Sequence, residues 1–143
     1  MMTCEEFIED CKKHLRKPYI YGANGPDSFD CSGFVQFVLK DVGLDPSGDQ
    51  SAEGLYEYFH DPNNGVVVDT PECGCLVFYG EQDNIQHVAL CIDKENMIEA
   101  GGGDHNTTSV EIARKKKAEV RIKPINRRSD IVDFIRPIGL PWS

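Results

Sequence analysis

One cysteine of the chain lies in a context that suits nucleophilic chemistry. Cys31 follows a segment rich in glycine, asparagine and proline, and it opens a predicted helix in the run Phe-Asp-Cys-Ser-Gly at residues 29–33. Unpaired N–H groups and the positive end of the helix dipole favour the thiolate there, and the same N–H groups can receive an oxyanion. A buried, unreactive cysteine at a helix start is the alternative.

A thiolate nucleophile needs a base and a group that orients the base. His87 opens the most apolar strand-like run, residues 87–92, whereas the other three histidines lie in a charged helix or in polar turns. Glu99 follows twelve residues later (99 − 87), and two neighbouring antiparallel strands would bring its carboxylate beside the ring. Taken alone, such a histidine is usually structural and such a glutamate usually faces solvent. Together with Cys31 they form a candidate Cys-His-Glu triad.

Metal binding is the rival chemistry. Cys73, Cys75 and His87 offer three soft ligands, but no second pair has zinc-site spacing and there is no His-Glu-x-x-His motif. The glycines at 101–103 lack the Lys-Ser/Thr of a phosphate loop. We therefore expect neither a metal nor another cofactor.

The elements that must position these residues change character along the chain. Helices are predicted at residues 3–15, 31–42 and 51–59, from helical spacing of apolar residues and from capping residues such as Thr3 with Glu6 and Asp30. Short apolar runs bounded by turn residues then predict strands at 66–68, 75–79, 88–92, 97–100, 120–122 and 131–135. Helices first and strands afterwards indicate an α+β fold with an antiparallel sheet.

Composition limits the classes of protein. The 143 residues suit one domain, 1–143, and carry a formal net charge of −9, which argues against a nucleic acid partner. The only basic run, residues 114–117, is interpreted as a solvated loop or a helix end. No apolar run reaches the length of a membrane span, and no secretory signal is visible, so we expect synthesis in a reducing cytoplasm. The six cysteines are therefore interpreted as thiols, with Cys4 and Cys11 in the core, rather than as disulfides.

Four segments carry a resemblance to a known family. The run at 19–36, Tyr-Ile-Tyr-Gly-Ala-Asn-Gly-Pro-Asp-Ser-Phe-Asp-Cys-Ser-Gly-Phe-Val-Gln, resembles the signature of the NlpC family of papain-like cysteine peptidases. Residues 76–79, 87–90 and 97–100 resemble the next three blocks in the same order, and a weaker similarity extends to the last strand. The resemblance implies a papain-like fold, with N-terminal helices packed on a central antiparallel sheet.

The resemblance also implies an activity and residue roles. Members hydrolyse the γ-D-glutamyl–diamino acid amide of bacterial peptidoglycan stem peptides. Cys31 would be the nucleophile, His87 the base, and Glu99 the third polar residue, where members most often carry histidine. Tyr19 would help to bind the substrate or the oxyanion, and Asp30 and Ser32 would bind the free amino group of the stem dipeptide.

Some features depart from the family pattern. Tyr21 replaces a tryptophan, Ala23 a glycine, and Cys75 stands where members often have aspartate. The absence of a leader suggests a phage-encoded or virion-associated enzyme that acts on the cell wall, with phage tail proteins as further partners. Two alternatives remain: a phage tail or assembly component that uses the fold as a binding module, and a papain-like hydrolase or acyltransferase that acts on another amide.

Overall fold

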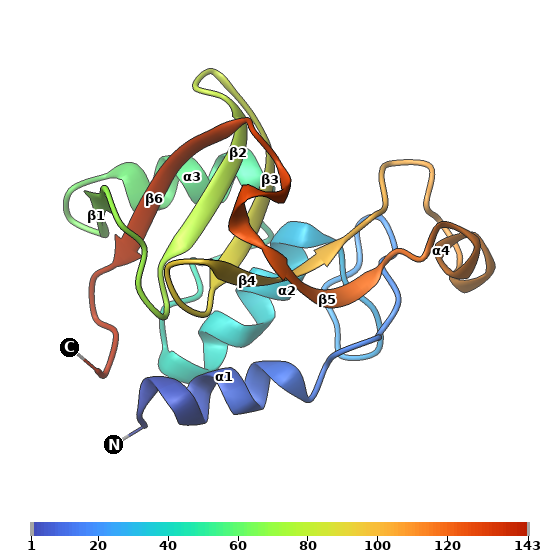
Figure 1. Ribbon diagram of the computed structural model, residues 1–143, viewed down its shortest axis with the longest axis horizontal. Coiled ribbons are helices and arrows are strands. Elements are labelled where there is room, and N and C mark those ends of the chain that lie inside the picture. The colour runs from blue at the N-terminus through green and yellow to red at the C-terminus, as the bar shows by residue number, and fades with distance from the viewer. Residues whose placement is uncertain (1, 143) are drawn as a thin grey trace.

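The computed structural model describes residues 2–142, and an antiparallel sheet forms its centre (Figure 1). The strand order is β1-β6-β2-β3-β4-β5, so the last strand lies between the first and the second. Every neighbouring pair is antiparallel. This mixture of helices and antiparallel strands confirms the predicted fold class. The strands are β1 (Gly65–Val68), β2 (Leu76–Glu81), β3 (Asn84–Cys91), β4 (Asn96–Gly101), β5 (Glu119–Pro124) and β6 (Ile131–Pro137).

The first three predicted helices are present, each with a side-chain cap at its N-terminus. α1 (Cys4–Lys12) begins with the capping box of Thr3 and Glu6, α2 (Cys31–Leu39) with Asp30, and α3 (Ala52–His60) with Ser51. α1 is shorter than the predicted 3–15, because the chain turns after Lys12 and reaches a left-handed backbone at Arg16. A 3-10 turn, η1 (Lys40–Val42), extends α2 over the rest of the predicted range.

A fourth helix, α4 (Val110–Lys116), was not predicted. Only Ala113 of its seven residues is buried, so the sequence carries no apolar stripe at helical spacing. The basic run at 114–117 forms the last turn and cap of this helix, which agrees with one of the two interpretations given to it. No helix within residues 2–142 is both long enough and apolar enough to cross a membrane.

Both faces of the sheet bury apolar side chains. α2 packs against β3 and β4, and α3 packs against β1, β3 and β6. Along β2 the side chains alternate, so that Leu76 and Phe78 join the larger core under the helices, while Val77 and Tyr79 join a smaller cluster on the other face. The start of α2 is therefore held against the central strands by a packed core.

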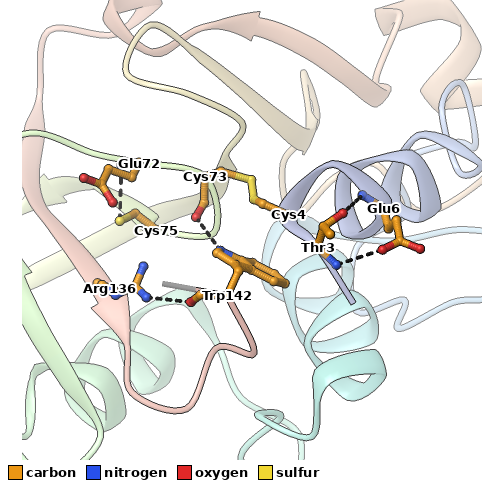
Figure 2. Close-up of a disulfide and its surroundings, with 8 residues drawn as sticks. All are labelled: Thr3, Cys4, Glu6, Glu72, Cys73, Cys75, Arg136 and Trp142. Atoms are coloured by element: carbon orange, nitrogen blue, oxygen red, sulfur yellow. Dashed lines mark hydrogen bonds between the residues drawn. A yellow bond between two sulfur atoms is a disulfide. The ribbon is translucent and has the colours of Figure 1, made fainter. Parts of the chain in front are cut away.

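The prediction that the cysteines are thiols is wrong for two of them. Cys4, at the start of α1, forms a disulfide with Cys73, in the turn before β2 (Figure 2). The indole N–H of Trp142 donates to the carbonyl of Cys73 at 3.2 Å, and its ring packs on Phe7 with centroids 5.2 Å apart. The disulfide joins α1 to the turn before β2, and the contacts of Trp142 attach the C-terminal segment to both. Long-range pairing of this kind has no signature in residue spacing.

The remaining cysteines are free thiols. Cys11 lies in the core, as predicted, and Cys75 and Cys91 are buried in the smaller cluster. Burial raises the pKa of each of these three thiols above its ordinary range. Cys31 is the only free cysteine of the described residues that is partly exposed.

Candidate active site

A cleft of about 930 Å³ runs past the start of α2. Five of the six residues singled out by the sequence line it: Tyr19, Asp30, Cys31, Ser32 and His87. The sixth, Glu99, is 1% exposed and lies behind His87. The fold thus gathers residues from the loop before α2, from α2 and from β3 around one opening.

Cys31 is the first residue of α2, and its position leaves two backbone donors free. Of the first four N–H groups of the helix, that of Gly33 donates to Asp30 Oδ1 at 2.7 Å and that of Phe34 donates to the Asp30 carbonyl at 3.0 Å. The N–H groups of Cys31 and Ser32 have no acceptor among residues 2–142. They are the donors that a helix N-terminus offers to an oxyanion.

His87 lies between the thiol of Cys31 and the carboxylate of Glu99. In the antiparallel pairing of β3 with β4, Leu90 lies opposite Ile98. Glu99 is the next residue of β4, in the direction that leads along β3 toward His87. His87 Nε2 and Glu99 Oε1 are 2.6 Å apart, which leaves Nδ1 as the ring nitrogen available to the thiol. Burial works to lower the pKa of His87, but the neighbouring Cys31 and Glu99 outweigh it and raise the pKa to about 9. The imidazole is therefore positively charged at neutral pH.

Glu99 is a buried carboxylate with a partner on each oxygen. Its Oε2 accepts a hydrogen bond from Arg121 Nε at 2.9 Å, and Arg121 is the residue directly opposite it on β5. Burial works to raise the pKa of Glu99, but His87 and Arg121 outweigh it and lower the pKa to about 2. Glu99 is thus ionised at any pH at which the protein is expected to work.

The three predicted substrate-binding residues differ in whether their polar atoms already have hydrogen-bond partners. Both carboxylate oxygens of Asp30 already accept hydrogen bonds, Oδ1 from Gly33 and Ser32 and Oδ2 from the N–H of Gly22. Asp30 therefore holds the start of α2 to the preceding loop, whatever else it binds. Tyr19 is buried against the cleft, and this burial raises the pKa of its phenol, which stays a neutral donor.

A second part of the cleft lining was missed in the sequence. Asp49, Gln50 and Ser51 line it, and the loop that carries them is fixed by the buried side chain of Gln36 on α2. Gln36 donates to the carbonyl of Gly48 at 3.0 Å and accepts from the N–H of Gln50 at 3.2 Å. A single glutamine inside a helix gives no sign of a loop that lies fourteen residues away.

Two arginines were also missed. Arg121 belongs to a short strand in which charged and apolar residues alternate, and only the register of β4 with β5 shows that it faces Glu99. Arg128 lines the cleft, with its guanidinium 5.0 Å from the ring centre of Tyr79 and hydrogen-bonded to Asp130. Neither position carries a recognisable motif.

The metal alternative loses one of its ligands. Cys73 is bonded to Cys4, and no cluster of three or more histidine, cysteine, aspartate or glutamate side chains suited to a metal occurs within residues 2–142. The candidate chemistry of the cleft is therefore that of a thiol beside an imidazolium, with free N–H donors at the same point.

Comparison with known proteins gives a consistent result. The model of the NlpC/P60 family matches residues 16–123. A probable endopeptidase p60 of Listeria grayi is 37% identical over 91 residues, 64% of this chain and 17% of that protein. A gamma-D-glutamyl-L-lysine dipeptidyl-peptidase of Bacillus cereus is 30% identical over 115 residues, 77% of this chain and 31% of that protein. The chain thus spans less than a third of these curated relatives.

A solved structure agrees with the fold. The P60 domain of an antigen from M. avium subspecies paratuberculosis superposes with a TM-score of 0.69 at 23% identity, over 95% of this chain and 94% of that one. This likeness confirms the papain-like arrangement that the resemblance implied, with helices packed on a central antiparallel sheet.

Proposed function

The chain belongs to the NlpC/P60 family, a family of peptidases, and on that premise we propose that its cleft hydrolyses the γ-D-glutamyl–diamino acid amide of bacterial peptidoglycan stem peptides. The observation that carries the proposal is the line of side chains from Cys31 through His87 to the buried carboxylate of Glu99. In this proposal residues 1–143 form one catalytic domain, and Cys31, His87 and Glu99 form its triad.

The reaction follows from the charges in the cleft. The thiolate of Cys31 attacks the γ-carbonyl carbon, and the oxyanion accepts hydrogen bonds from the free N–H groups of Cys31 and Ser32. The His87 imidazolium gives its proton to the leaving amine, the C–N bond breaks, and a thioester to Cys31 remains. Neutral His87 then takes a proton from water as the water attacks the thioester. The C–S bond then breaks, which releases a γ-carboxylic acid and restores the Cys31 thiolate beside the His87 imidazolium.

The charge on the cleft wall supports a substrate with amino groups. Asp30, Asp49, Glu53 and Asp104 all line the cleft, and carboxylates attract ammonium groups. A stem dipeptide with a free N-terminus, joined to a diamino acid, carries such groups on both sides of the scissile bond. The B. cereus relative, whose name includes a γ-D-glutamyl-L-lysine bond, supports the same class of amide. The relatives reported above come from bacteria. We therefore restrict the proposed substrate to the stem peptides of the bacterial cell wall.

Mass spectrometry of the products tests the proposal. Wild-type protein, Cys31→Ala and Cys11→Ala are incubated with purified peptidoglycan and with L-Ala-γ-D-Glu-diamino acid tripeptides that contain either L-lysine or meso-diaminopimelate. We expect a new free amine on the diamino acid with wild type and with Cys11→Ala, because Cys11 is a core thiol, and none with Cys31→Ala.

The outcomes separate the alternatives. Cleavage of the tripeptide but not of the intact wall indicates recognition of a free N-terminus in the cleft. If no substrate is cleaved while Cys31 is reduced and the protein is folded, the proposed bond is wrong. If Cys31 also reacts with iodoacetamide no faster than the buried thiols, the proposed nucleophile is wrong as well.

A further inference from the structure

Arg121 lies at the end of a buried chain of polar contacts that runs from His87 through Glu99. Glu99 has partners on both carboxylate oxygens, His87 at 2.6 Å and Arg121 at 2.9 Å. The Arg121 side chain is only 14% exposed, and that of Glu99 is 2% exposed. An arginine this well covered has given up most of its hydration, and the Glu99 carboxylate provides the compensating charge.

The surrounding backbone leaves room for this ion pair and for little else. A Cβ added at Gly101 would lie 2.6 Å from Glu99 Oε2 and 3.0 Å from an Arg121 nitrogen. A Cβ added at Gly102 would lie 2.9 Å from the other terminal nitrogen of Arg121. The register Glu99↔Arg121 of β4 and β5 aligns the two side chains across the sheet.

A buried glutamate without a second partner has two ways to fail as an orienting group. It can take up a proton, because burial penalises the charged form, or it can turn its carboxylate away from His87. A hydrogen bond from the guanidinium to Oε2 opposes both, because it favours the charged form and fixes the rotation of the carboxylate.

We propose that Arg121 is a positioning residue of this site, which keeps Glu99 ionised and directs Oε1 at His87. The inference rests on the proposed function only in assigning Cys31 as the nucleophile. Removal of the positive charge of Arg121 raises the pKa of Glu99, since the carboxylate then loses an attractive charge and a hydrogen bond. Glu99 then takes up a proton at higher pH, and the loss of its pairing with the His87 imidazolium moves to higher pH with it. The other titratable and charged groups facing His87 and Glu99 are Cys31, Tyr19, Tyr79, Arg127, Arg128 and Asp130.

Alkylation of Cys31 measures this without any substrate. The rate of reaction with iodoacetamide is followed against pH for wild type, Arg121→Met, Arg121→Lys and Lys123→Met. Lys123 is the matched control, because it lies two residues along β5 and pairs with Met97 rather than with Glu99. We expect the acid midpoint of the rate to rise by about one pH unit in Arg121→Met, and to stay within a few tenths of a unit of wild type in Arg121→Lys and Lys123→Met.

A double variant separates positioning from general stability. Glu99→Gln leaves no carboxylate to take up a proton, so adding Arg121→Met to it should move the midpoint no further. Thermal melts confirm that each variant is folded at the assay temperature. If Arg121→Met does not fold, Arg121→Lys replaces it. Arg121→Lys keeps the charge but changes the hydrogen-bond geometry, and we expect a lower rate of turnover. An unchanged midpoint in Arg121→Met, or equal shifts in Arg121→Met and Lys123→Met, overturns the inference. A wild-type Cys31 that is no more reactive than the buried thiols overturns the proposed function instead.

Discussion

Loss of the Cys4–Cys73 disulfide should cost a large part of the stability of the fold. The two cysteines are 69 residues apart, and closing a loop of that size in the unfolded chain corresponds to about 4 kcal/mol of stabilisation through chain entropy. The perturbation is the double substitution Cys4→Ala with Cys73→Ala, which leaves no unpaired thiol. The neighbouring packing of Phe7 and Trp142 remains available in the variant.

The assay is urea unfolding with and without reductant. Trp142 is the only tryptophan of the chain and donates a hydrogen bond to Cys73, so its fluorescence reports on this region, while circular dichroism reports on the helices and the sheet. We expect reductant to lower the free energy of unfolding of wild type by about 4 kcal/mol, and not to affect the double variant. The slope of free energy against urea should also be larger in the variant, because its unfolded state is less compact.

A control thiol and the cleft provide the checks. Cys11→Ala should cost about 1–2 kcal/mol for a buried sulfur, and it should keep the full sensitivity to reductant. Turnover should be the same in the double variant at temperatures where it is folded, because the disulfide lies outside the residues that line the cleft. If reductant changes the stability of wild type by less than about 1 kcal/mol, the assignment of the disulfide as a main stabilising link is refuted.

Three further predictions concern the cleft. Glu99→Gln should lower kcat about tenfold or more while the protein stays folded, since an amide keeps the shape of the carboxylate but not its charge; rates equal to wild type would remove Glu99 from the triad. The raised pKa of His87 contributes stability that is complete below pH 6.5 and is lost as the pH rises through about 9. The lowered pKa of Glu99 contributes stability that is complete above pH 4.5 and is lost as the pH falls through about 2. Urea midpoints measured against pH should lose the alkaline transition in His87→Ala, and a persisting transition would assign it elsewhere. Asp30→Ala should lower the free energy of unfolding by about 1–2 kcal/mol, because it removes the cap of α2; a loss of activity with no loss of stability would instead mark Asp30 as a substrate ligand alone.

Local patterns predicted much of the fold, because they act over a few residues. The capping box of Thr3 and Glu6 and the cap at Asp30 start the helices where they were expected. The same holds for the site: the prediction that neighbouring antiparallel strands bring Glu99 beside His87 is confirmed by their 2.6 Å contact. The roles of these residues in catalysis stay predictions.

The features that were missed depend on long-range pairing. The disulfide joins two cysteines whose own surroundings show no relation, and Arg121 meets Glu99 only through the register of two strands. α4 was missed because its own local pattern is weak. It buries a single residue, so the sequence has little apolar pattern to display. Cap residues such as Ser109 were its only local signal.

The position of β6 has a consequence for the order in which the molecule is made. β6 is the last strand of the chain, yet it lies between β1 and β2, so the sheet remains open until residues 131–137 have left the ribosome. Cys31 is synthesised 56 residues before His87 (87 − 31), and the two side chains cannot meet until β3 has been made and paired. The cleft that holds these two side chains is therefore assembled late relative to Cys31, and the sheet behind it is complete only once β6 has been inserted.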